Sequence, residues 1–129
     1  MNRNIGVLAS GRGSNLEAII KNIERGICIA KVVVVISDNP EARALKIARE
    51  HNINALYLEP GPKKTYLLPE YEENYVKILK EHDVNLVCLA GFMRILKQPL
   101  LSAFPNKILN IHPSLLPAFP GLDAQRKAL

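Results

Sequence analysis

The chain has 129 residues, of which 48% are apolar and 22% charged, which suffices for one globular domain with a sizeable core. Its net charge of +5 comes from scattered Lys and Arg with no basic run or aromatic strip, so we expect a small anionic ligand and no nucleic acid. No apolar run reaches the roughly 18 residues of a membrane span, and the first apolar stretch is too short for a signal peptide, so we expect a cytoplasmic protein without membrane contact.

Strand and helix patterns alternate along the chain. The strand pattern is clearest at residues 31–37, because a continuous β-branched run is typical of a parallel strand covered on both faces. The helix pattern is clearest at residues 16–23, where Leu and Ile recur at i, i+3, i+4 and i+7. In chain order the sequence predicts strand 5–9, helix 16–23 closed near Gly26, strand 31–37, helix 40–49 with Pro40 in its first turn, strand 55–58, helix 71–82, strand 85–90, helix 97–104 and strand 108–111.

This alternation predicts an α/β fold with a doubly wound, mostly parallel sheet, Rossmann-like, with helices on both faces. In such a sheet, ligands bind beyond the carboxyl ends of the strands, where the strand order reverses. Chemically unusual turns follow three of the predicted strands, at residues 10–15, 91–94 and 112–113. The sequence therefore predicts a ligand site at this edge of the sheet.

The first of these turns, G-R-G-S-N at residues 11–15, precedes a helix whose free N–H groups attract an anion. A local alternative remains, because Ser14 and Glu17 form an S-x-x-E capping box that by itself explains both residues. The Gly-Lys-Ser/Thr of a phosphate-binding P-loop is not present, which argues against a P-loop nucleoside triphosphatase. A dinucleotide site stays a minor alternative, with Asp38 on the ribose, although Leu16 replaces the third glycine of that fingerprint. One phosphate fits better than a pyrophosphate.

Asn110 and His112 stand at the end of the last predicted strand, and Pro113 ends its ladder. Side chains two residues apart on a strand point to the same face, so the amide and the imidazole enter one pocket. A neutral donor beside a titratable one suits a reaction in which negative charge develops on a carbonyl oxygen. The alternative is an ordinary strand end with a structural histidine.

Three motifs follow one another: G-S-N-L at residues 13–16, A-G-F-M-R-I-L at 90–96 and N-I-H-P-S-L-L-P at 110–117. With them the chain resembles the phosphoribosylglycinamide formyltransferases, folate-dependent enzymes of purine synthesis, over its whole length. The third motif is shared with other formyltetrahydrofolate enzymes, including methionyl-tRNA formyltransferase and formyltetrahydrofolate deformylase. The first two motifs narrow the resemblance to the glycinamide ribonucleotide branch.

The resemblance implies formyl transfer from 10-formyltetrahydrofolate to the amine of glycinamide ribonucleotide, without a metal or a covalent enzyme intermediate. It assigns the substrate phosphate to Gly13, Ser14 and Asn15. It assigns the folate to Met93, Arg94, Ile95, Leu96 and Asn110. It also implies that Asn110 donates to the oxyanion of the tetrahedral intermediate, and that protonated His112 stabilises it and supplies a proton to the departing folate nitrogen.

The sequence departs from the family pattern in two places. Members commonly carry an Arg before the third helix that meets the glutamate tail of the folate, whereas residues 67–69 contain none, and Lys63 or Lys64 is the available substitute. The chain also ends within a predicted helix, 123–129, before the segment that carries a catalytic Asp in the family. We therefore expect residues 1–129 to be the N-terminal, phosphate- and substrate-binding part of a formyltransferase domain.

Three functions follow as hypotheses. The first is the formyltransferase just described, inactive as an isolated part and self-associating through an exposed sheet edge. The second is an inactive module that binds phosphorylated metabolites, or another enzyme that uses formyltetrahydrofolate. The third is a degenerate dinucleotide-binding domain.

Overall fold

The computed structural model describes residues 3–26 and 29–111 of the chain. Its sheet has five parallel strands in the order β3-β2-β1-β4-β5. The strands are β1 (Asn4–Ala9), β2 (Lys31–Ser37), β3 (Asn54–Tyr57), β4 (Leu86–Leu89) and β5 (Ile108–Asn110). The helices are α1 (Ser14–Glu24), α2 (Arg43–Glu50), α3 (Pro69–Glu81) and α4 (Gln98–Ala103). The predicted α/β fold is confirmed, and every strand pairing described is parallel.

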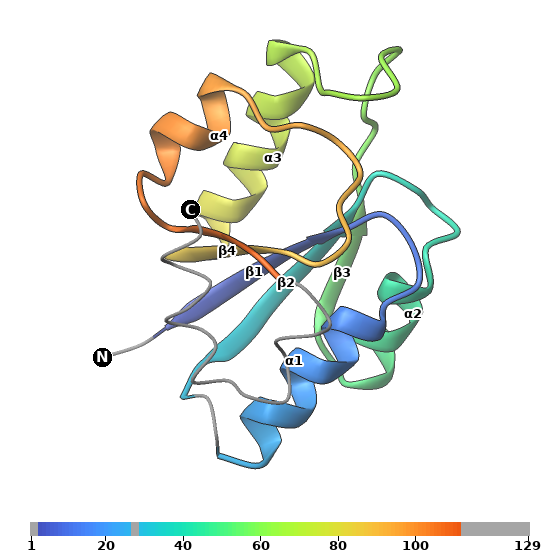
Figure 1. Cartoon of the computed structure of the whole chain (residues 1–129), viewed down its shortest axis with the longest axis vertical. Helices are drawn as coiled ribbons and strands as arrows, with labels where there is room; N and C mark the ends of the chain where they lie inside the picture. Colours follow the sequence, from blue (N-terminus) through green and yellow to red (C-terminus); the bar gives the residue numbers. More distant parts are fainter. Residues whose placement is uncertain (1–2, 27–28, 112–129) are drawn as a thin grey trace.

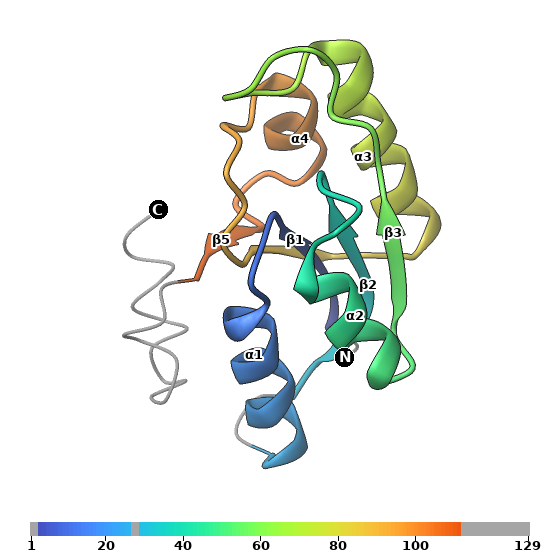
Figure 2. The ribbon, with the colours of Figure 1, turned by 90° about the vertical axis from the view of Figure 1, so that its right-hand side faces the viewer.

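Two helices cover each face of the sheet, as Figures 1 and 2 show. Leu16 of α1 and Leu45 of α2 belong to one apolar core, whereas Tyr75 of α3 and Leu100 of α4 belong to the other. Both faces of β2 are covered, which explains its continuous β-branched sequence. No helix in the described part of the chain has both the length and the apolarity that crossing a membrane requires.

Most predicted boundaries differ from the structure by one or two residues, and the largest difference is at the start of α2. Helix α2 begins at Arg43, so Pro40 does not lie in its first turn. The preceding residues form a side-chain-supported turn instead, in which the Ser37 hydroxyl accepts from the Asn39 N–H at 3.1 Å and Asn39 Oδ1 accepts from the Glu41 N–H at 3.0 Å. Such local bonds from Ser and Asn compete with helix formation, which delays the helix by three residues.

Cys88 is buried on β4, as expected of an isolated thiol in an apolar context. Cys28, His112, Pro113 and the third family motif beyond residue 111 lie outside the described residues.

Candidate functional site

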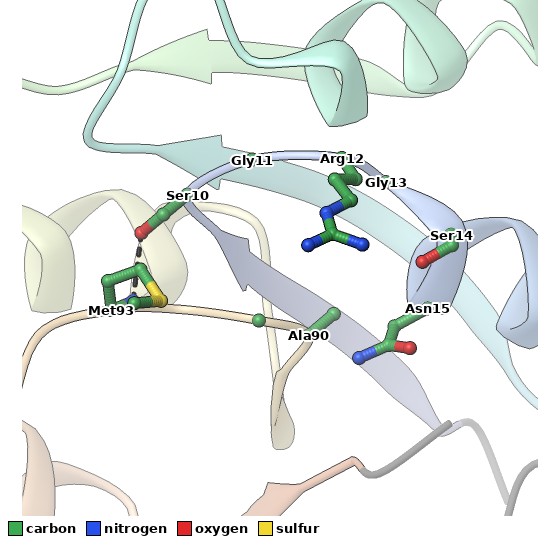
Figure 3. Close-up of a pocket in the computed structure, with 9 residues that line it drawn as sticks. Ser10, Gly11, Arg12, Gly13, Ser14, Asn15, Ala90 and Met93 are labelled. Atoms are coloured by element: carbon green, nitrogen blue, oxygen red, sulfur yellow. Dashed lines mark hydrogen bonds between the residues drawn. The ribbon is translucent and has the colours of Figure 1, made fainter. Parts of the chain in front are cut away.

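The strand order reverses between β1 and β4, which lie side by side although other strands separate them in the sequence. A pocket of about 400 Å³ opens beyond the carboxyl ends of these two strands. It is lined by Ser10, Gly11, Arg12, Gly13, Ser14, Asn15, Ala90, Gly91 and Met93 (Figure 3). The structure therefore brings together two of the three turns that the sequence singled out, at the place where a doubly wound sheet binds its ligands.

The turn after β1 is held by its backbone. Gly13 has a φ of 83° and occupies the N-cap position of α1, where its carbonyl accepts from the Glu17 N–H at 2.9 Å. The Gly11 carbonyl accepts from the Ala44 N–H of α2 at 3.2 Å. A Cβ on Gly13 would lie 2.6 Å from Ile47 Cδ1, so both the left-handed backbone and the close approach of α2 require glycine here.

The capping-box alternative for Ser14 and Glu17 is wrong. Gly13 fills the N-cap position, Ser14 is already the first residue of α1, and no side-chain hydrogen bond caps the helix. A capping hydroxyl must belong to the N-cap residue, which lies outside the helical backbone conformation. The exposed Ser14 hydroxyl therefore has no role in capping and faces the pocket opening.

Asn15 joins this turn to the last strand. Its side chain is only 8% exposed, and its Nδ2 donates to the Ile111 carbonyl at 3.2 Å. Within the described residues its Oδ1 has no hydrogen-bond partner. Asn15 thereby holds the chain just before His112 against the N-terminus of α1. Asn110 ends β5 with an exposed side chain and does not line the pocket.

Ser10 connects the two turns that form the pocket. Its hydroxyl accepts from the Met93 N–H at 2.9 Å, and its own N–H donates to the Gly91 carbonyl at 3.3 Å (Figure 3). The residues expected to bind phosphate and those expected to bind folate are thus fixed relative to each other through one serine.

Met93 and Ile95 present apolar side chains to solvent, at 75% and 63% exposure. The segment that carries them runs beside the loop before α3, because the Ile95 N–H donates to the Thr65 carbonyl at 2.8 Å. Arg94 and Leu96 alternate with them and are turned partly inward. Two exposed apolar side chains on a fixed, extended segment suit contact with a flat aromatic ligand.

The guanidinium of Arg94 is engaged within the protein. Its Nε lies 2.5 Å from Asp38 Oδ2, and its Nη1 donates to the Lys63 carbonyl. The side chains of Arg94 and Asp38 are only 14% and 6% exposed. Asp38 is a poor ribose ligand, because its Oδ2 is paired with Arg94 and its Oδ1 is buried, which weakens the dinucleotide alternative.

Sequence reasoning missed Glu72, which is fully buried on α3. Both of its carboxylate oxygens accept from the Lys97 N–H at 3.1 Å, and Oε2 accepts from the Leu100 N–H at 2.9 Å. These N–H groups belong to the start of α4, so Glu72 acts as its cap from a neighbouring helix. The available signal was its place on the buried face of α3, three and seven residues before Tyr75 and Leu79.

The phenols of Tyr57 and Tyr75 stay protonated at neutral pH, because the pKa of each is raised. Burial raises the pKa of Tyr75, whose hydroxyl donates to the Leu58 carbonyl at 2.9 Å. The hydrogen bond to Glu59 raises the pKa of Tyr57. Within the described residues, no three His, Cys, Asp or Glu side chains gather to form a metal site.

Comparison with known proteins places these features in one family. The family model described as "Formyl transferase" matches residues 3–129. Phosphoribosylglycinamide formyltransferase of Bacillus subtilis is 40% identical over 122 residues, which are 95% of this chain and 62% of that protein. The trifunctional purine biosynthetic protein adenosine-3 of Gallus gallus is 38% identical over 125 residues, which are 97% of this chain and 12% of that protein.

A solved structure agrees with the sequence relatives. The crystal structure of glycinamide ribonucleotide transformylase 1 from Symbiobacterium toebii has a TM-score of 0.79 and 48% identity. The match covers 98% of this chain and 59% of the other. The chain thus spans about three fifths of the length of the single-function relatives that it matches.

Proposed function

The chain belongs to the formyl transferase family, and from this premise we propose that it serves the transfer of a formyl group from 10-formyltetrahydrofolate to the amine of glycinamide ribonucleotide. The observation that carries the proposal is the pocket between the turns after β1 and β4. One wall offers a helix N-terminus to an anion, and the other offers exposed apolar side chains to a ring. These two walls match the two ligands, because the substrate carries an anionic phosphate and the folate carries a flat ring.

In this proposal the phosphate binds at Gly13, Ser14 and Asn15, where the backbone N–H groups of α1 begin. The pterin of the folate lies against the segment that begins at Met93 in the opposite wall and continues beyond the pocket, with hydrogen bonds to the backbone of four residues: Met93, Arg94, Ile95 and Leu96. Lys63 and Lys64 are exposed beside this wall, because the Lys63 carbonyl is bound by Arg94, and we assign the glutamate tail of the folate to these lysines.

The chemistry needs no metal in this proposal. The substrate amine attacks the formyl carbon, and the bond between that carbon and the folate nitrogen breaks. Asn110 donates to the oxyanion and to the bound folate, and protonated His112 stabilises the intermediate and passes a proton to the departing nitrogen. The attacking amine releases one proton as it becomes the formamide, so the number of protons balances. The link from Asn15 to Ile111 supports this arrangement, since it holds the end of β5 beside the phosphate turn.

Calorimetric titration tests the binding half of the proposal. We expect the 129-residue chain to bind glycinamide ribonucleotide and a stable 10-formylfolate analogue, and not NAD. Binding of the ribonucleotide without the folate analogue would favour the metabolite-binding alternative. Release of formate from 10-formyltetrahydrofolate without an acceptor amine would favour a deformylase.

Substitution of Asn110 and His112 tests the catalytic half. In the polypeptide that turns over substrate, Asn110→Ala and His112→Ala should each lower kcat by about 100-fold or more, the range of an oxyanion donor or general acid. Substrate dissociation constants should change far less, because these interactions strengthen in the transition state. Near-normal turnover by His112→Ala would remove this mechanism.

Self-association and a cytoplasmic location remain part of the proposal. β5 forms one edge of the described sheet, and Ile108 and Leu109 on it are apolar. An unpaired apolar edge invites pairing with another chain. We expect the 129-residue chain to elute above monomer mass in size-exclusion chromatography with light scattering, and a monomer at all concentrations would contradict this.

A further inference from the structure

Arg12 is the cation of the pocket. It lies between the two glycines of the turn after β1, and its exposed side chain lines the pocket. Figure 3 shows its guanidinium reaching over the space between Ser10 and Asn15. The guanidinium of Arg94, by contrast, is paired with Asp38 and also donates to the Lys63 carbonyl. Arg12 forms no ion pair within residues 3–26 and 29–111.

The charges around Arg12 favour an anionic ligand. Among the described residues, the eight others that line the pocket include no Asp or Glu and no second cation. The N-terminus of the 11-residue helix α1 adds the positive end of its dipole to the same space. Asn15, only 8% exposed, also lines this space, and its Oδ1, which has no partner within the described residues, is an acceptor for a hydroxyl group of the ligand and does not itself bind the anion. The described lining therefore carries a positive charge without a neighbouring carboxylate, which favours the binding of an anion.

We propose that Arg12 is a specificity-determining residue that pairs with the substrate phosphate held at the N-terminus of α1 and makes the pocket selective for phosphorylated ligands. The inference rests on the proposed function, since it takes the anion to be the phosphate of glycinamide ribonucleotide. A phosphate monoester has three terminal oxygens, so the N–H groups at the start of α1 can bind one of them while the guanidinium binds the other two. The planar guanidinium fork matches two phosphate oxygens, which the ammonium of a lysine cannot do.

Ribose 5-phosphate and ribose are the probes, because they differ only in the phosphate. The variants are Arg12→Gln, which removes the charge, and Arg12→Lys, which keeps the charge without the fork. Arg25→Gln is the matched control, since Arg25 is an equally exposed arginine at the opposite end of α1. Calorimetric titration gives the affinities, and thermal unfolding shows that each variant folds.

We expect Arg12→Gln to weaken ribose 5-phosphate binding by about 10- to 100-fold, the range of one charge-assisted hydrogen-bonded pair. The affinity of Arg12→Lys for ribose 5-phosphate should lie between those of Arg12→Gln and the wild type, and the affinity of Arg25→Gln should equal that of the wild type. Ribose should bind weakly to all four proteins. Binding by Arg12→Gln equal to the wild type would overturn the role of Arg12 and leave the phosphate site at α1 standing. Failure of the wild-type chain to prefer ribose 5-phosphate over ribose would overturn the phosphate site and the role of Arg12 together.

Discussion

The two walls of the pocket are held mainly by different groups. The turn at residues 10–15 is held mainly by its backbone, through Gly13 at the helix start and the Gly11 carbonyl on α2, with one further bond from the Asn15 side chain to the Ile111 carbonyl. The segment at residues 91–97 is held largely by side chains from elsewhere, with Glu72 capping its far end. In the first wall the polar side chains of Arg12 and Ser14 are exposed, whereas in the second segment the apolar side chains of Met93 and Ile95 are exposed.

This difference matches the ligands that we propose for the two walls, a phosphate for residues 10–15 and a flat ring for residues 91–97. A phosphate is bound by backbone N–H groups and flexible polar side chains, so the scaffold must be the backbone itself. A flat apolar ring needs exposed apolar side chains at fixed positions, so polar side chains must anchor the segment from beneath. Substitutions should therefore act on different properties in the two walls.

The largest effect is expected at Glu72. Glu72→Ala leaves the Lys97 and Leu100 N–H groups at the start of α4 without their acceptor. The loss of several buried hydrogen bonds to a charged acceptor should lower the free energy of unfolding by about 4 kcal/mol. Urea denaturation measures it, with Glu73→Ala as the control, because Glu73 is exposed on the same helix and should change by less than about 0.5 kcal/mol. Equal effects of both substitutions would show that Glu72 does not anchor α4.

The two left-handed glycines of the pocket provide a matched pair. Gly13→Ala and Gly91→Ala both place a side chain at positive φ, 83° and 75°, which costs roughly 1–2 kcal/mol. Only at Gly13 does the new Cβ also meet Ile47 and Ala44, whereas at Gly91 it meets nothing within 4 Å. Gly13→Ala should therefore destabilise by about 2 kcal/mol more than Gly91→Ala in thermal or urea unfolding. A reversed order would mean that the turn at residues 10–15 is not held by its backbone.

The smallest effects are expected at the two serines. Ser10→Ala removes the acceptor of the Met93 N–H and should cost about 1 kcal/mol of unfolding free energy. Ser14→Ala removes no capping bond and should change stability by less than about 0.5 kcal/mol, while weakening phosphate binding. Denaturation and titration of the same two variants measure both quantities. A stability loss at Ser14 as large as that at Ser10 would restore a structural role for the Ser14 hydroxyl.

The sequence by itself determined the order and type of the elements. Residues 31–37 form β2 with the predicted bounds, because a continuous β-branched run fits only a strand covered on both faces. The place of the pocket was also predicted from sequence, since two of the three unusual turns after parallel strands meet at one edge of the sheet. Local patterns suffice for these statements, because each depends on neighbouring residues or on a general rule of parallel sheets.

Only the tertiary structure decided which side chains are free for a ligand. Ser14 and Glu17 have the letters of a capping box, yet the contact of Gly13 with α2 moves the helix start by one residue. Arg94 and Arg12 are both arginines of the turns at the pocket, but among the described residues only Arg94 is bound by a carboxylate, which lies 56 positions away. Glu72 caps a helix that begins more than twenty residues later. Such pairings join residues distant in sequence, and their geometry exists only once the strands and helices have packed.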